Sequence, residues 1–246
     1  KHILSNVPHN NEMVLPDHRI RHADGTWRWF SGKVSNVLHE KTIQGFILNA
    51  HDITLRKNAE AEVLYQAKHD PLTGLANRTL LMDQLALSIH RAVKSRRKLG
   101  LVFIDVDHFK TINDSLGHDV GDMLLKDVAK RLTQAIGERD LVARFGGDEF
   151  VVLVESSEDD EGASILSTAT KVLDIFDTPC ESNGRLRQIS ASAGAIITDG
   201  EQDGPALLRD ADAAMYQAKS KGRAQLQFFD AALQANLHHR VELAHE

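Results

Sequence analysis

The spacing of apolar and polar residues divides the chain into two parts with different patterns. Strand-like alternation covers residues 18–22, 26–38 and 42–50, and a turn signal separates the first two stretches. From 55 to 66 the apolar residues recur at helical spacing in an Ala- and Glu-rich segment. The pattern therefore predicts a small N-terminal sheet that is followed by a connecting helix.

Beyond a break at residues 69–74, helices and strands mix. Amphipathic spacing predicts helices at 79–95, 119–136, 162–176 and 205–220. Apolar runs predict a buried strand at 99–106, a hairpin at 141–155, and strands at 189–198 and 225–229, and we expect a loop at 107–122. This mixture predicts an α+β (α/β layered) fold in which helices flank a central sheet.

Composition and charge exclude several classes of partner. Of 246 residues, 42% are hydrophobic and 26% are charged, which is ordinary for a globular protein. A net charge of −6 favours neither nucleic acid nor an anionic membrane, and no apolar run approaches the ~20 residues of a membrane span. The single Cys180 fits a reducing compartment, so we expect a cytoplasmic location. Because Lys1 is not a natural start, we expect a fragment, and an upstream sensor or membrane anchor stays open.

The segment at 144–150 holds the first candidate for chemistry. Gly146 and Gly147 separate two apolar runs, which indicates a tight hairpin turn, and Asp148 and Glu149 follow directly. Adjacent carboxylates offer hard oxygen ligands for a divalent cation. Because the two glycines have no side chains, a bulky ligand can approach the backbone of the turn. Taken alone, such a tip is more often an ordinary solvated turn.

A second acidic site, Asp105-Val106-Asp107, ends the strand predicted at 99–106. Alternation places Asp105 and Asp107 on one face, where they form either a metal site or a helix-capping loop. In combination with the hairpin acids, they could converge on a cation pair of the kind used in phosphoryl transfer.

The loop expected at 107–122 carries residues that suit a nucleotide. Lys110 can hold a phosphate as a point charge. Asn113 and Asp122 can read a base, because a carboxylate accepts the two parallel N–H bonds that guanine offers and adenine does not. The alternative for Asn113 and Asp122 is ordinary turn and N-cap duty.

Four segments, in order, together resemble the GGDEF family of diguanylate cyclases. They are the hairpin Gly146-Gly147-Asp148-Glu149-Phe150 and the segments 70–78, 103–122 and 212–223. The resemblance implies a palm-like nucleotidyl-cyclase fold with a central, mainly antiparallel sheet. It also implies that two GTP condense to cyclic di-GMP and two pyrophosphates, in a homodimer whose domains meet face to face.

The resemblance also implies roles for individual residues. Asp105, Asp148 and Glu149 would be catalytic. Mg²⁺ or Mn²⁺ would be bound by Asp105, Glu149 and the Val106 carbonyl, with support from Asp148. The family pattern prefers Asp105 to Asp107 as the ligand. Substrate contacts would come from Phe109, Lys110, Asn113, His118, Asp122, Gly146, Gly147, Lys219 and Arg223.

One position departs from the family pattern. Many members carry an Arg-x-x-Asp inhibitory site just before the hairpin, where product binds. Asp140 matches the acid, but Gly137 stands at the arginine position and Arg139 is out of register. We therefore predict that product inhibition through this site is weak or absent.

The flanking segments complete the expected organisation. Residues 1–53 resemble the C-terminal half of a PAS sensor domain, 54–68 would be a signalling helix that mediates dimerisation, and 69–230 would be the GGDEF domain. Residues 231–246 read as a helix and faintly resemble the lead-in to an EAL phosphodiesterase domain. Two functions stay open: an active cyclase under sensor control, or a catalytically silent GTP-binding module that regulates an adjoining EAL-type phosphodiesterase.

Overall fold

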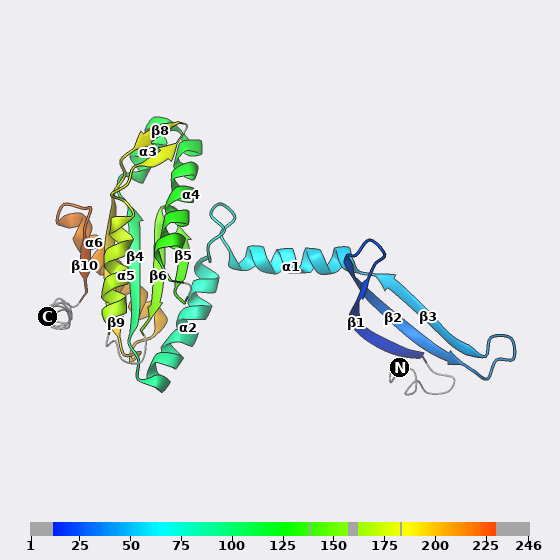
Figure 1. Ribbon diagram of the computed structural model, residues 1–246. Helices are drawn as coiled ribbons and strands as arrows, with labels where there is room; N and C mark the ends of the chain where they lie inside the picture. Colours follow the sequence, from blue (N-terminus) through cyan, green and yellow to red (C-terminus); the bar gives the residue numbers. More distant parts are fainter. Residues whose placement is uncertain (1–11, 138, 157–161, 183, 230–246) are drawn as a thin grey trace. The chain divides into compact units, whose positions relative to one another are not determined.

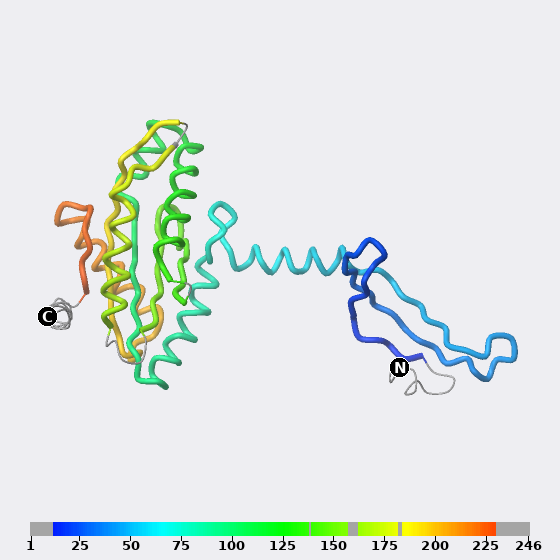
Figure 2. The backbone as a smooth tube through the Cα atoms, viewed as in Figure 1, coloured from blue at the N-terminus to red at the C-terminus, as the bar shows by residue number. Residues whose placement is uncertain are grey.

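The computed structural model describes residues 12–137, 139–156, 162–182 and 184–229 (Figures 1 and 2). The chain divides into two compact units, Lys1–Gln66 and Ala67–Glu246. No helix in these ranges combines the length and the apolar character that a membrane crossing requires. The expected C-terminal helix at 231–246 lies outside the described residues.

The first unit is a three-stranded antiparallel sheet in the order β1-β2-β3. Its strands are β1 (Glu12–Arg21), β2 (Trp27–Val37) and β3 (Gly45–Asp52), and α1 (Thr54–Lys68) follows. The strand expected at 18–22 begins earlier, because β1 continues through an irregularity between Leu15 and His18 that accommodates Pro16. The predicted N-terminal strands and connecting helix are confirmed.

The second unit is built on a five-stranded sheet in the order β10-β9-β4-β6-β5. The strands are β4 (Leu99–Val106), β5 (Leu141–Gly146), β6 (Glu149–Glu155), β9 (Ala191–Thr198) and β10 (Leu226–Phe228). β4 pairs antiparallel with both β6 and β9, β5 pairs antiparallel with β6, and β10 runs parallel to β9. Every residue of the central strand β4 is buried.

Helices cover both faces of this sheet, and strand alternation decides which core each β4 residue enters. Leu101 and Phe103 pack with α2 (Arg78–Ser95) and α6 (Gly204–Ser220). Val102 and Ile104 pack with α4 (His118–Ala135) and α5 (Ala163–Asp174). The three-layer arrangement, which Figure 1 shows, confirms the predicted α+β fold with a mainly antiparallel sheet.

Two elements differ from the expectation. Residues 107–122 are not a loop: α3 (Phe109–Leu116) forms there, because Phe109 is buried and Ile112, one turn later, packs against the same core. Gly117, with φ of 87°, ends α3 and leads into α4. A small hairpin of β7 (Cys180–Ser182) and β8 (Arg185–Arg187) was not predicted, since its three-residue strands are too short to show a period.

Candidate functional site

Two of the predicted acids lie side by side on neighbouring strands. Asp105, near the end of β4, is the direct antiparallel partner of Glu149, the first residue of β6. Side chains of paired residues point to the same face of a sheet, so the two carboxylates share one environment. Lys219, in the last turn of α6, places its Nζ 2.7 Å from Asp105 Oδ2.

This crowding changes the proton affinity of both acids. Burial raises the pKa of Asp105, and the nearby Asp148 raises it further, whereas Lys219 acts in the opposite direction. Burial also raises the pKa of Glu149, with additional repulsion from Asp105, Asp212 and Asp148. Clustered carboxylates that repel one another favour a cation at their centre.

A pocket of about 210 Å³ opens beside these acids. Four separate chain segments line it: the end of β4, the start of α3, the turn between β5 and β6, and the end of α6 with the turn that follows it. The lining residues are Asp105, Val106, Asp107, His108, Phe109, Lys110, Asp148, Lys219 and Arg223. The pocket thus brings together acids and three cations, the mixture that a metal–nucleotide complex requires.

The Gly146-Gly147 turn is held by Arg144, a role that no local sequence pattern indicates. Gly147 has φ of 48°, a conformation that a residue with a Cβ resists. Arg144 donates to the Gly147 carbonyl through Nε (3.0 Å) and Nη2 (2.7 Å), and its Nη1 lies 3.0 Å from Asp70 Oδ1. Arg144 therefore ties the hairpin tip to the segment at 70–78.

The residues expected to contact guanine lie on α3 and α4. Asn113 of α3 packs against Gly121 of α4, where a Cβ would fall 1.9 Å from Asn113 Oδ1. That oxygen is buried and accepts no hydrogen bond from the described residues. Asp122 follows Gly121 directly and is exposed. A buried acceptor without a hydrogen-bond partner is unusual in proteins. Asn113 Oδ1 and the exposed Asp122 carboxylate are therefore candidates to accept hydrogen bonds from a bound ligand.

Of the other predicted substrate contacts, some line the pocket and others do not. His118 is exposed as the first residue of α4 and does not line the pocket, whereas Phe109 is buried at the start of α3 and does. Lys110 is exposed beside Phe109, at the pocket wall. The residues expected to bind phosphate line the pocket, whereas Asn113, His118 and Asp122 lie outside its lining, on α3 and α4.

Asp107 has a different environment from Asp105. It is 4% exposed, and its carboxylate accepts hydrogen bonds from Ser190 Oγ (2.7 Å), Ser192 Oγ (2.8 Å) and the Ala224 N–H (3.2 Å). Both of its oxygens are occupied within the protein. The strand-end pattern offered Asp107 as a metal ligand, and these contacts favour Asp105 in that role.

The donor set suits a divalent cation that is shared with a substrate. Within the described residues, no group of three or more His, Cys, Asp or Glu side chains is placed to hold a metal ion. Mg²⁺ does not require such a group, because it is commonly bound by one or two carboxylates, water and substrate phosphates. Asp105 and Glu149, with the Val106 carbonyl, offer hard oxygens of this kind.

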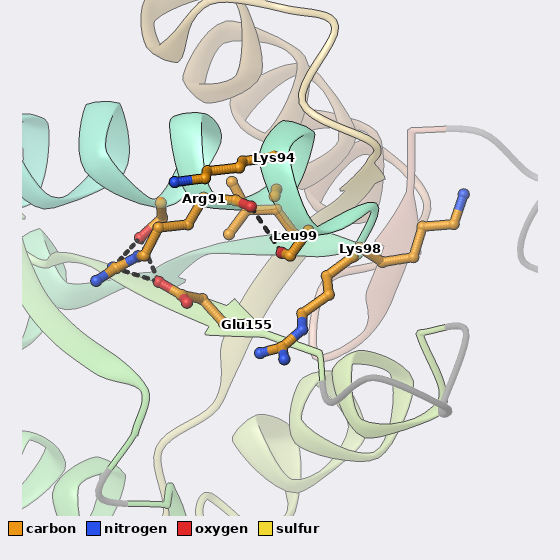
Figure 3. A pocket seen from close by; sticks show the side chains of 9 residues that line it. Arg91, Lys94, Lys98, Leu99 and Glu155 are labelled. Carbon is orange, nitrogen blue, oxygen red and sulfur yellow. Dashed lines mark hydrogen bonds and ion pairs between the residues drawn. The ribbon is translucent and has the colours of Figure 1, made fainter.

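A second pocket, of about 360 Å³, lies at the opposite end of β4. Figure 3 shows Arg91 and Glu155 pointing toward each other within it. Glu155 accepts from Arg91 Nη2 (2.5 Å) and Ser88 Oγ (2.6 Å), and its own N–H donates to Asp140 Oδ1 (3.4 Å). Asp140, the acid of the expected inhibitory motif, therefore lies beside this pocket, in which Arg91 is already paired with Glu155.

Comparison with known proteins agrees with this geometry. The family model described as "Diguanylate cyclase, GGDEF domain" matches residues 67–225. MucR of Pseudomonas aeruginosa, a bifunctional diguanylate cyclase/cyclic di-GMP phosphodiesterase, is 39% identical over 189 residues, covering 76% of this chain and 27% of MucR. The cyclic di-GMP phosphodiesterase NbdA of the same organism is 36% identical over 227 residues, covering 91% of this chain and 28% of NbdA.

A solved structure shows the same fold. The GGDEF domain of TpbB from Pseudomonas aeruginosa is 37% identical and superposes with a TM-score of 0.62, covering 69% of this chain and 99% of that chain. This chain spans little more than a quarter of the length of MucR and NbdA. The resemblance to PAS domains at residues 1–53 stays a prediction. Through residues 67–225, the chain belongs to the GGDEF family of diguanylate cyclase domains.

Proposed function

We propose that this chain is a diguanylate cyclase that condenses two GTP into cyclic di-GMP and releases two pyrophosphates. The observation that supports this most is the pocket in which Asp105 and Asp148 meet Lys110, Lys219 and Arg223. Acids for a metal and cations for phosphates converge there, next to the buried Asn113 acceptor. The residues expected for the family reaction are all present.

Each group in the site has a role in this proposal. Asn113 and Asp122 hold the guanine edge, while Lys110, Lys219 and Arg223 neutralise the phosphates. Mg²⁺ or Mn²⁺, held by Asp105, Glu149 and the Val106 carbonyl, would polarise the α-phosphate and acidify the 3′-hydroxyl. Asp148 helps to hold that cation or to accept the hydroxyl proton. The chain's own contribution is positioning and charge neutralisation.

Catalysis in this proposal requires two copies of the domain. One site holds one GTP, so the 3′-hydroxyl in one copy attacks the α-phosphate in the other. Helix α1 provides a surface for pairing, because it has no buried residue and exposes Leu55 (87%) and Val63 (65%) along one row. The N-terminal sheet would act as part of the sensor that sets how the two cyclase domains approach each other.

The alternative is a GTP-binding module that regulates an adjoining phosphodiesterase without turnover. The similarity to NbdA, which covers most of this chain, is the observation that favours it. In that case GTP would bind without being converted. The two functions therefore predict the same binding and different products.

The test is incubation of the purified chain with GTP and Mg²⁺, followed by chromatography of the nucleotides. We expect cyclic di-GMP from the wild type and none from Glu149→Gln, since that change removes a charged ligand oxygen. Glu155→Gln is a matched control, because Glu155 ends the same strand β6 at the second pocket and should leave turnover unchanged. GTP binding with no product would favour the regulatory module.

A further inference from the structure

Asp107, which lines the pocket, connects three segments: the end of β4, the start of β9 and the turn that follows α6. It follows β4 directly, two residues after Asp105, and its N–H donates to the Ser190 carbonyl (2.9 Å). Its carboxylate binds the hydroxyls of Ser190 and Ser192 at the start of β9. The same Oδ2 that accepts from Ser190 also accepts the N–H of Ala224, which lies 117 positions later in the chain.

The Ala224 contact lies in an unusual turn. After α6, the residues Gly222, Arg223 and Ala224 have φ of 117°, 64° and 46°. Two of these three residues carry a Cβ, and non-glycine residues with positive φ mark backbone that surrounding contacts must hold in place. The Arg223 N–H donates to the Ala218 carbonyl (3.0 Å), which secures the N-terminal side of the turn.

The hydrogen bond from Asp107 secures the other side. The Ala224 nitrogen belongs to the peptide bond that follows Arg223, so fixing its direction fixes the backbone of Arg223 itself. Arg223 lines the same pocket as Asp105 and Lys219. The direction in which the Arg223 side chain leaves the backbone thus depends on the buried carboxylate of Asp107, which also lines that pocket.

We propose that Asp107 is a positioning residue, which holds the turn at Arg223 so that the guanidinium faces the substrate phosphates. The inference rests on the proposed function and deepens it, by assigning to Asp107 a role in phosphate binding that is separate from metal binding. Asp107 acts through Arg223 and through hydrogen-bond geometry, without requiring its negative charge.

Two substitutions at Asp107 separate this role from that of a metal ligand. In Asp107→Asn, the amide oxygen can replace Oδ2 and accept from Ser190 and Ala224, while the amide nitrogen donates to Ser192 Oγ, which can accept. Asp107→Ala removes all three contacts. A positioning role therefore predicts that Asn retains GTP affinity and Ala does not. If Asp107 were a metal ligand, GTP affinity would fall in both variants, because the Asn amide oxygen lacks the negative charge of the carboxylate.

The experiment measures GTP affinity by calorimetry with Ca²⁺ in place of Mg²⁺, for wild type, Asp107→Asn, Asp107→Ala, Arg223→Ala and the Asp107→Ala/Arg223→Ala double variant. We expect Asp107→Ala to weaken binding by about tenfold, which corresponds to the loss of one hydrogen bond to a charged group. The double variant should bind no more weakly than Arg223→Ala alone. Asp107→Asn should stay within about threefold of wild type.

Three results would overturn the inference: equal losses in the Asn and Ala variants, additive losses in the double variant, or Asp107→Ala with a lowered melting temperature and unchanged GTP affinity. Because binding is measured without turnover, the proposed function is tested separately. A wild-type chain that binds GTP and forms no cyclic di-GMP would contradict the cyclase activity, and the comparison of Asp107 variants would still be valid.

Discussion

Gly121 leaves room for the side chain of Asn113, which we propose contacts guanine. An added Cβ would lie 1.9 Å from Asn113 Oδ1 and 3.0 Å from Phe109 Cζ. The end of the Asn113 side chain can move aside, so we expect Gly121→Ala to fold and to displace the amide from its place. GTP affinity should fall by about tenfold or more. Fluorescence titration with a labelled GTP analogue measures this loss.

The matched comparison is Asn113→Ala, alone and combined with Gly121→Ala. If Gly121 acts by making room for Asn113, the double variant should bind no more weakly than Asn113→Ala. Unchanged affinity in Gly121→Ala would show that the position of the Asn113 amide is unimportant for GTP.

Asp70 provides a prediction that depends on pH. Burial raises its pKa, but hydrogen bonds from Thr73 and Arg144 outweigh that effect, so the pKa lies below its ordinary value of 3.8. The ionised carboxylate therefore stabilises the fold fully above the unfolded-state pKa, and this contribution is lost as the pH falls through the lower folded-state pKa. Asp70→Asn should lower the free energy of unfolding by about 1–3 kcal/mol at neutral pH.

Urea unfolding of wild type and Asp70→Asn over a series of pH values checks the sign. The difference between the two proteins should be constant near neutral pH and should shrink below 3.8. A difference that grows in acid would contradict the assigned direction.

A candidate site residue can be recognised from the sequence alone when the residues next to it in the chain indicate its role. Asp105, Asp148 and Glu149 stand next to strand ends and glycines, so their neighbours in the chain reveal them. The role of Arg144 depends on Asp70, 74 positions away. Asp107 has the same strand-end pattern as Asp105, and only its contacts with Ser190, Ser192 and Ala224 separate the two.

At the scale of elements, the close approach of α6 to β9 positions Lys219. A Cβ at Gly194 of β9 would lie 2.1 Å from the Ala211 carbonyl oxygen and 2.1 Å from the Met215 nitrogen. These are backbone atoms of α6, so the helix itself must shift. We expect Gly194→Ala to lower the free energy of unfolding by about 1–3 kcal/mol or more and to weaken GTP binding as well.

Urea unfolding and GTP titration measure the two effects. Gly137→Ala is the control for unfolding, because a Cβ there would meet no heavy atom nearer than Asp140 Oδ2 at 3.9 Å. If Gly194→Ala and Gly137→Ala were equally stable, the close packing of α6 on the sheet would not be a constraint.

The long helices could be predicted because each repeats its period several times, and the central strand because its apolar run is continuous. α2 and α6 agree closely with the expected ranges, since their apolar residues face the core at regular spacing, and β4 agrees because every one of its residues is buried. α3 could not be predicted in this way. It has eight residues and is rich in Asn, Asp and Ser, so local preference indicates a loop while packing of Phe109 favours a helix.

At the scale of the whole molecule, we predict that product inhibition is weak, because Gly137 stands where many family members carry an arginine. Asp140 is partly buried and accepts the Glu155 N–H, and Gly137 stands opposite with no side chain. We expect cyclic di-GMP to bind this chain weakly in calorimetry. Gly137→Arg should strengthen binding by about tenfold or more, because arginine adds a charge-assisted contact to phosphate.

The gain should disappear when Asp140→Ala is added to Gly137→Arg. Tight binding of cyclic di-GMP to the wild type, abolished by Asp140→Ala alone, would contradict the predicted loss of product inhibition.

We propose that two copies of this domain join two GTP molecules into one cyclic product. The most direct measurement is the stoichiometry of the reaction with Mg²⁺, with GTP, pyrophosphate and cyclic di-GMP quantified in the same samples over time. We predict that two GTP disappear and two pyrophosphates appear for each cyclic di-GMP formed. Hydrolysis of GTP without a cyclic product, or GTP that binds and stays unchanged, would contradict the account.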